Sequence, residues 1–119
     1  MKPAELVIQY LEAWDSKDAA QIAACLDPDV TFKGPLSQTA GRDAFLTAVT
    51  RMLPMLKTVK LRHLFVEGDT ALAVYDFTCH APVGNIRTCE LLTLKDDLIQ
   101  SSEIFFDARP LAPPQRSAA

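Results

Sequence analysis

Apolar residues at the start of the chain recur at the spacing of an α-helix. Leu6, Tyr10 and Trp14 follow one another every four residues, so they fall on one helical face. Pro3 is a residue favoured in the first turn of a helix, because the backbone N–H that it lacks would have no partner there. The pattern predicts a first helix over residues 3–15.

Two further helices are predicted before residue 58. Asp18, followed three residues later by Gln21, has the spacing of a capping box and predicts the start of a second, short helix. A third helix is expected from Arg42, after a loop over residues 34–41. Pro54 has no backbone N–H and its ring crowds the preceding turn, so this helix should kink or end there.

From residue 59 onward the apolar period changes to two, which is the period of β-strands. A brief strand is expected earlier, and four longer ones follow: 30–32, then 59–66, 70–80, 85–94 and 98–106. Short connections make neighbouring strands antiparallel, so the four long strands should form a meander. Three N-terminal helices followed by this sheet predict an α+β fold.

Composition agrees with a folded domain and argues against some partners. The chain has 119 residues, of which 49% are hydrophobic and 23% charged, a balance typical of globular domains. We expect one domain over residues 1–108 and a flexible, proline-rich tail over 109–119. The net charge of −3 and the scattered basic residues argue against nucleic acid and anionic membranes as partners.

Neither a targeting segment nor a cofactor motif is recognisable. No apolar run approaches the length of a membrane span or a signal peptide, and the three cysteines are odd in number without CxxC spacing. We therefore expect buried thiols in a cytoplasmic protein. The two histidines do not stand with carboxylates at metal-ligand spacing, and no glycine-rich phosphate loop occurs, so neither a metal nor a cofactor is expected.

The strand expected over residues 70–80 has no clearly solvated face, although a half-exposed antiparallel strand should alternate apolar and polar residues. One face carries Ala71, Ala73, Tyr75, Phe77 and Cys79, and the other carries Leu72, Val74, Asp76, Thr78 and His80. One face should pack on the helices and the other on a different surface. A homodimer formed through the sheet is the simplest expectation.

Four short motifs occur in an order that resembles a known family. They are Trp14-Asp15-Ser16-Lys17-Asp18, Leu26-Asp27-Pro28-Asp29-Val30-Thr31-Phe32, Gly41-Arg42-Asp43-Ala44-Phe45 and Glu103-Ile104-Phe105-Phe106-Asp107. Together they resemble the SnoaL-like branch of the nuclear transport factor 2-like superfamily. The resemblance implies a cone-shaped, cystatin-like roll, in which a strongly curved antiparallel sheet wraps a helix around a small cavity. The superfamily includes ketosteroid isomerases, limonene epoxide hydrolases, polyketide cyclases and non-catalytic binding modules, so the fold does not settle the function.

The resemblance also implies which side chains line the cavity. The expected lining is mostly apolar with a few polar groups, the usual composition of a small-molecule site. Besides Tyr10, Asp76 and Glu90, it comprises Trp14, Phe32, Leu72, Val74, Thr78, His80, Thr88, Ser102, Ile104 and Phe106.

Asp76 is the first catalytic candidate. Its apolar neighbours would disfavour the ionised carboxylate, which raises the pKa toward the range useful for a general base. It is similar to one acid of the limonene epoxide hydrolase motif, whose other two positions are Val74 and Ile104 here. The alternative is that Asp76 lies on the outer face of the sheet or bonds to a loop.

Tyr10 and Glu90 are the second pair of catalytic candidates. They resemble the tyrosine and the carboxylic acid of the ketosteroid isomerase oxyanion hole, where apolar surroundings keep the acid protonated. The position of the isomerase general base is Gly34 in this chain. Tyr10 is alternatively a core aromatic residue, with Glu90 bonded to a buried backbone or arginine group.

Three functions remain open from the sequence. The chain is either a cofactor-independent isomerase, cyclase or hydrolase that uses a pocket acid on a small hydrophobic substrate, or a non-catalytic module that binds such a molecule, or a structural dimerisation domain.

Overall fold

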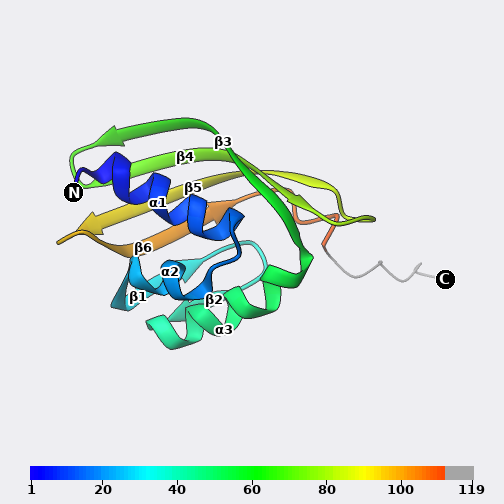
Figure 1. Ribbon diagram of the computed structural model, residues 1–119, viewed down its shortest axis with the longest axis horizontal. Coiled ribbons are helices and arrows are strands. Elements are labelled where there is room, and N and C mark those ends of the chain that lie inside the picture. The colour runs from blue at the N-terminus through cyan, green and yellow to red at the C-terminus, as the bar shows by residue number, and fades with distance from the viewer. Residues whose placement is uncertain (112–119) are drawn as a thin grey trace.

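Three helices cover one face of a curved, six-stranded mixed sheet (Figure 1). The computed structural model describes residues 1–111. The helices are α1 (Pro3–Asp15), α2 (Ala19–Ala24) and α3 (Arg42–Met52). The strands are β1 (Leu26–Lys33), β2 (Gln38–Ala40), β3 (Leu56–Glu67), β4 (Thr70–Cys79), β5 (Asn85–Lys95) and β6 (Leu98–Phe105). The fold is therefore α+β, as the sequence predicted.

Local signals in the sequence set the helix ends. The first helix has the predicted bounds, with Pro3 in its first turn. Asp18 Oδ1 accepts a hydrogen bond from the backbone N–H of Gln21 at 3.1 Å, so the predicted cap of α2 is confirmed. The third helix ends at Met52, and a 3₁₀ turn over Leu53–Met55 contains Pro54. The predicted interruption at this proline is also confirmed.

The sheet has the order β2-β1-β6-β5-β4-β3. The four predicted long strands form the antiparallel meander β3-β4-β5-β6. The sequence predicted a fully antiparallel sheet, and here the structure corrects it: β1 runs parallel to β6, with Phe32 opposite Ser102, and β2 forms within the expected loop. A pairing between strands so far apart in the chain leaves no local turn signal.

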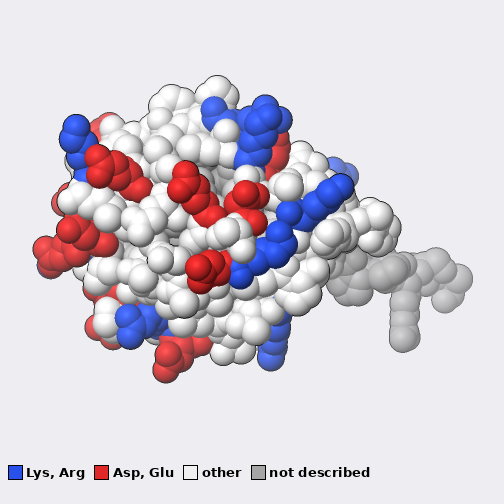
Figure 2. Space-filling view, viewed as in Figure 1, with Lys and Arg blue, Asp and Glu red and all other residues white. Residues whose placement is uncertain are grey.

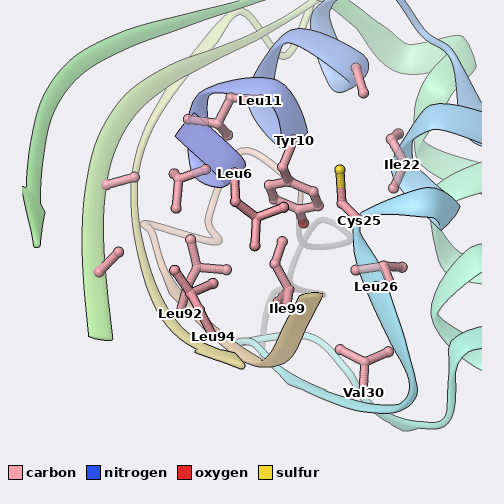
Figure 3. Close-up of a cluster of buried hydrophobic side chains, with 14 of the residues drawn as sticks. Leu6, Tyr10, Leu11, Ile22, Cys25, Leu26, Val30, Leu92, Leu94 and Ile99 are labelled. Atoms are coloured by element: carbon pink, nitrogen blue, oxygen red, sulfur yellow. The ribbon is translucent and has the colours of Figure 1, made fainter. Parts of the chain in front are cut away.

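The hydrophobic core lies between the helices and the inner face of the sheet (Figure 3). The helix α1 contributes a stripe that includes Val7 and Tyr10, and Ile22 of α2 lies beside it. Leu92 and Ile99, from β5 and β6, are fully buried opposite these helical residues. This packing fixes α1 against the sheet and so positions the side chains at its C-terminal end.

A β-bulge interrupts the pairing of β3 with β4. Leu61 lies opposite Tyr75 and His63 lies opposite Val74, so Arg62 is an extra residue without a partner on β4. Bulges bend a strand and re-aim its side chains. This one turns Arg62 toward the face of the sheet that is opposite to the helices.

On the face of residues 1–111 seen in Figure 2, acidic and basic side chains both occur, and some of the basic ones adjoin in a short diagonal row. No helix in this part of the chain is long and apolar enough to cross a membrane. The predicted tail lies largely outside the described residues, which end at Leu111.

Candidate functional site

A cavity of about 150 Å³ lies between α1, α3, the inner face of the sheet and the connection that follows β1. Its lining is almost entirely apolar. Trp14 forms edge-to-face contacts with Tyr10 and Phe77, at ring-centroid distances of 6.5 and 5.9 Å. Phe32 and Phe45 form a similar contact at 5.3 Å. Three of the four walls thus carry aromatic rings in the edge-to-face arrangement that aromatic pairs favour.

The connection over residues 34–37 closes one side of the cavity. Gly34 lies so close to β6 that an added Cβ atom would be 2.9 Å from Cγ1 of Ile104 and 3.3 Å from Cζ of Phe32. Real Cβ atoms essentially never come as close as 2.9 Å to another heavy atom. Gly34 is therefore required for the close approach of this connection to β6, and the contact narrows the cavity.

Glu90 provides the polar end of this apolar cavity. It lies on β5, is only 2% exposed, and accepts hydrogen bonds from three hydroxyl groups. The Tyr75 hydroxyl donates to Oε1 at 2.8 Å. The hydroxyls of Tyr10 and Ser102 donate to Oε2 at 3.2 and 2.5 Å. Glu90 and the two tyrosines are also part of the cavity lining.

Burial controls the ionisation of this cluster. Removal from water raises the pKa of the Glu90 carboxyl, and the hydrogen bonds from Ser102, Tyr75 and Tyr10 oppose that rise without cancelling it. Burial, together with the nearby Glu90 carboxylate, also raises the pKa of both tyrosines well above 10.0. The tyrosines therefore remain hydrogen-bond donors at neutral pH, and Glu90 is the group in the cluster that can exchange a proton.

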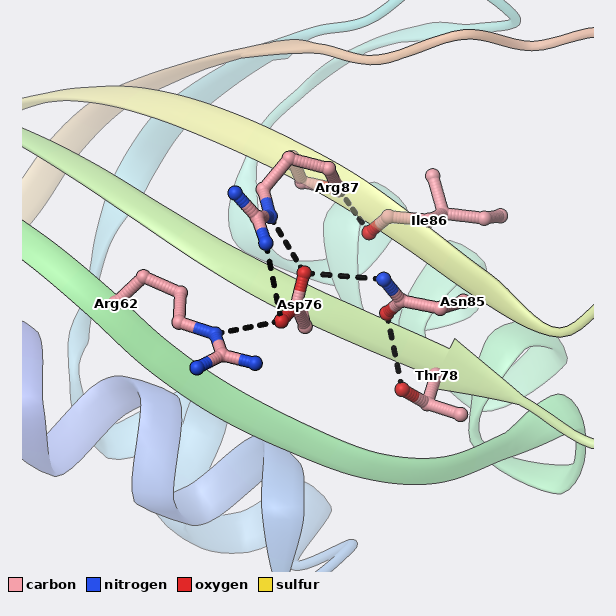
Figure 4. A network of polar contacts seen from close by, with 7 residues as sticks. Arg62, Asp76, Thr78, Asn85, Ile86 and Arg87 are labelled. Atoms are coloured by element: carbon pink, nitrogen blue, oxygen red, sulfur yellow. Dashed lines mark hydrogen bonds and ion pairs between the residues drawn. The ribbon is translucent and has the colours of Figure 1, made fainter.

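Asp76 lies on the outer face of the sheet, away from the cavity (Figure 4). Arg62 Nε donates to Oδ2 at 2.7 Å, Arg87 Nε donates to Oδ1 at 2.5 Å, and Asn85 Nδ2 donates to Oδ1 at 3.0 Å. Arg87, followed by Asn85 and Arg62, holds the pKa of this carboxyl well below its usual range. The alternative placement on the outer face is the one observed, and the expected rise of the Asp76 pKa is wrong.

The sequence prediction therefore interchanged the two faces of β4, so that the residues expected to point inward point outward. The register places Ala73 opposite Glu90 and Asp76 opposite Arg87, and partners opposite each other share a face. The even-numbered residues of β4 thus point outward. The expected lining residues that lie outside the cavity lining are Leu72, Val74, Thr78, His80 and Ser102. The first four were misplaced because the prediction interchanged the two faces of β4. Ser102 lies outside the lining and donates a hydrogen bond to Glu90.

The remaining expected residues do line the cavity: Tyr10, Trp14, Phe32, Thr88, Glu90, Ile104 and Phe106. The sequence interpretation missed Tyr75 as a member of the polar cluster. The hairpin could have revealed it, because counting back from the turn over residues 81–84 places Tyr75 opposite Glu90. In the observed register Ala73 lies opposite Glu90 and Asp76 opposite Arg87, which leaves Tyr75 on the same face as Glu90. An outward ion pair at Asp76 would have turned the neighbouring Tyr75 inward.

Within residues 1–111, no three or more histidine, cysteine or acidic side chains come together in a group that could hold a metal ion. The polar end of the cavity consists of the Glu90 carboxyl and the hydroxyls of Tyr10 and Tyr75, and the Ser102 hydroxyl bonds to Glu90 from outside the lining. This set is suited to hydrogen bonding and proton transfer.

Residues 7–102 match the family model of the SnoaL-like domain. The chain belongs to this family. The match includes most of the cavity lining, from Tyr10 on α1 to Glu90 on β5, and ends at Ser102 on β6. No curated protein matches the SnoaL-like chain.

Solved structures share the fold at low sequence identity. An NTF2-like protein of unknown function from Cytophaga hutchinsonii superposes with a TM-score of 0.82 at 22% identity, covering 93% of this chain and 95% of that one. An LEH-like epoxide hydrolase from M. tuberculosis gives 0.77 at 19% identity, covering 89% and 83%. A de novo designed protein with a curved β-sheet gives 0.80 at 12% identity, covering 92% and 89%. Likeness at this level shows the fold alone.

Proposed function

We propose that this SnoaL-like domain binds a compact apolar molecule that carries one hydrogen-bonding oxygen. The observation that supports this best is the single polar cluster around Glu90 at the end of an otherwise apolar cavity. Cavities of this composition, with few and convergent polar groups, are typical of small-molecule sites.

The size of the cavity limits the ligand to roughly one ring. An engineered apolar cavity of about 150 Å³ in another protein binds benzene, and the cavity described here has about the same volume. The ligand proposed is therefore a monocyclic ketone or a similar compact carbonyl compound.

The number of protons that the cluster can donate determines how it would bind the ligand oxygen. Each hydroxyl has one proton, and Tyr10, Tyr75 and Ser102 all direct theirs at Glu90. When the Glu90 carboxyl is protonated, its own O–H donates to one of these hydroxyls and releases that hydroxyl's proton for the ligand. Tyr10 makes the longest of the three bonds, at 3.2 Å, so it is the donor most easily released.

The only tryptophan of the chain provides a direct binding assay. Trp14 lines the cavity, so its fluorescence should respond to a bound ligand. We expect a saturable change with cyclohexenone and a weaker affinity for methylcyclohexane, which is similar in size but has no oxygen. The variant Ala48→Leu should abolish the change, because residue 48 lines the cavity, whereas Ala44→Leu on the exposed side of the same helix should retain it. An unchanged response in Ala48→Leu would refute the assignment of the ligand to this cavity.

A second candidate function is proton transfer to and from a carbon atom next to the ligand carbonyl. It is favoured by the raised pKa of the Glu90 carboxyl, which is the only carboxyl group in the cavity lining formed by residues 1–111. Glu90 would take the proton, and a tyrosine hydroxyl would stabilise the enolate oxygen. The Glu90 carboxyl would then exchange its proton with solvent and deliver a solvent-derived proton back to carbon. Asp76 cannot serve as the base in this cavity, because it lies on the opposite face of the sheet.

Deuterium exchange tests the second candidate separately. Wild-type protein in deuterated water should catalyse exchange at the carbon next to the carbonyl of cyclohexenone, as seen by NMR. The variant Glu90→Gln should bind the ketone without catalysing exchange. Equal exchange rates in the two proteins would exclude Glu90 as the base and leave the binding function intact.

A further inference from the structure

The cluster around Glu90 offers different hydrogen-bonding groups to the cavity in its two ionisation states. In the ionised state the hydroxyl protons of Tyr10, Tyr75 and Ser102 are all donated to the carboxylate. Within residues 1–111, Oε2 accepts two of these bonds and Oε1 accepts one, from Tyr75 at 2.8 Å. Each carboxylate oxygen can accept two hydrogen bonds. The ionised cluster therefore has an acceptor position left at Oε1 and no hydroxyl proton left to donate.

The protonated state offers the reverse. The carboxyl proton of Glu90 is a fourth proton in the cluster, and when it is donated to one of the hydroxyl groups, it frees that group's own proton. Tyr10 and Tyr75 line the cavity, whereas Ser102 lies outside the lining, so a freed proton reaches a ligand from one of the tyrosines. The protonated cluster therefore presents a hydrogen-bond donor to the cavity.

Glu90 sets the charge of this part of the molecule at neutral pH. In residues 1–111, the other titratable side chains that line the cavity are Tyr10 and Tyr75, and burial raises the pKa of both well above 10.0. Burial also raises the pKa of the Cys25 thiol, which lies near Tyr10, so this thiol stays neutral. Cys89 alternates with Glu90 along β5 and so points to the outer face of the sheet. Ionisation of the Glu90 carboxyl is therefore the event that changes the hydrogen bonds available to a ligand.

We propose that ionisation of Glu90 switches the cavity from ligands that accept a hydrogen bond to ligands that donate one. A compact ketone, which can only accept, binds the protonated cluster through a tyrosine hydroxyl. A compact alcohol also binds the ionised cluster, because its own O–H donates to Oε1 of Glu90. Hydrogen bonds to an ionised group are roughly twice as strong as neutral ones, so the alcohol gains affinity where the ketone loses it. This inference rests on the proposed binding function, and it adds compact alcohols as a second ligand class selected by pH.

Binding titrations with a ketone and its matching alcohol test the switch. Cyclohexenone and cyclohexenol have the same ring and differ in whether the oxygen is a carbonyl or a hydroxyl group. Each is titrated against the wild type by Trp14 fluorescence at steps from about pH 5 to about pH 9. The ketone binds the protonated fraction alone, so its dissociation constant should rise up to about tenfold per pH unit above the folded-state pKa of Glu90.

The ratio of the ketone dissociation constant to the alcohol dissociation constant is the decisive quantity. It cancels effects common to both ligands, such as displacement of water from the cavity. We expect this ratio to rise with pH in the wild type by up to about tenfold per pH unit. A ratio that does not change with pH would overturn the proposal. That is the result expected if the indole N–H of Trp14 or the hydroxyl of Ser37, which also line the cavity, held the ketone instead.

Two variants assign the pH dependence to Glu90. In Glu90→Gln the side chain cannot ionise, so the ratio should be the same at every pH. Glu12→Gln removes an exposed carboxylate from α1 and should keep the pH dependence of the wild type. An equal rise of the ratio in Glu90→Gln and wild type would overturn the switch and leave ligand binding intact. If neither ligand gives a saturable response at any pH, the binding function itself fails, and the switch fails with it.

Discussion

Replacement of Glu90 by glutamine tests the electrostatics of the cavity. Glutamine keeps the shape of the side chain and its carbonyl oxygen still accepts hydrogen bonds, but it cannot ionise. Glu90 is 2% exposed, and within residues 1–111 its side-chain partners are the hydroxyls of Tyr10, Tyr75 and Ser102. Removal of this one ionisable group should therefore change how stability depends on pH.

The direction in which stability changes with pH follows from the raised pKa of the Glu90 carboxyl. Below the unfolded-state pKa, about 4.3, the carboxyl is protonated in both states and its full contribution to stability is present. Above it, the unfolded chain ionises while the folded protein keeps its proton, so wild-type stability falls with rising pH until the folded pKa is reached. The fall is about 1.4 kcal/mol per pH unit in that interval. For a chain of this length, this is roughly 5 °C in Tm per pH unit.

Thermal unfolding followed by circular dichroism from pH 4 upward measures the effect. The Tm difference between Glu90→Gln and wild type should rise by roughly 5 °C per pH unit and level off above the folded-state pKa of Glu90. Glu12→Gln, which removes an exposed carboxylate from α1, serves as the control. A Tm difference between Glu90→Gln and wild type that does not change with pH would refute the assignment of a raised pKa to Glu90.

Three other variants give further expected outcomes. Asp76→Asn should lower Tm at pH 7, because the lowered pKa of the Asp76 carboxyl contributes stability to the wild type that acid removes. The Tm difference between the variant and the wild type should therefore shrink below about pH 4, and a Tm difference that persists in strong acid would contradict this. Gly34→Ala should weaken cyclohexenone binding in the Trp14 fluorescence assay, since the new methyl group meets Cγ1 of Ile104, and adding Ile104→Ala, which removes that atom, should restore it. Leu92→Ala should lower the free energy of unfolding in urea by about 2–5 kcal/mol, because Leu92 is fully buried; a loss below about 1 kcal/mol would show that the core relaxes around it.

Local chemistry allowed much of the fold to be predicted from the sequence. Pro3, the Asp18 cap and Pro54 act within a few residues of themselves, and the helix ends fall where they indicate. The parallel pairing of β1 with β6 joins Phe32 to Ser102 across most of the chain. No local turn specifies such a pairing, so the sequence predicted a fully antiparallel sheet.

Prediction of the candidate site depended on which alternate residues of each strand face inward. This is a weaker signal than the prolines and the cap that mark the helix ends. In β5 the inner residues were assigned correctly, and Glu90 lies where it was expected. In β4 both faces carry apolar residues, so periodicity could not distinguish Asp76 from Tyr75 as the inward residue. The register of the β4–β5 hairpin, which places Asp76 opposite Arg87, decides between them. The second ion pair, with Arg62, depends on a bulge that the apolar pattern does not indicate.

The close approach of Gly34 to Ile104 restricts how this cavity can acquire a second acid. By resemblance, these are the positions where the ketosteroid isomerases carry their base and the epoxide hydrolases their partnering acid. Any side chain at position 34 first meets Ile104, so a change at 34 alone should displace the connection rather than add a functional group. Replacing Ile104 with aspartate would add a carboxyl group and leave one γ-carbon where isoleucine has two, so the side chain could turn away from residue 34. Evolution or protein engineering starting from this sequence therefore has a preferred order of substitutions, with residue 104 before residue 34.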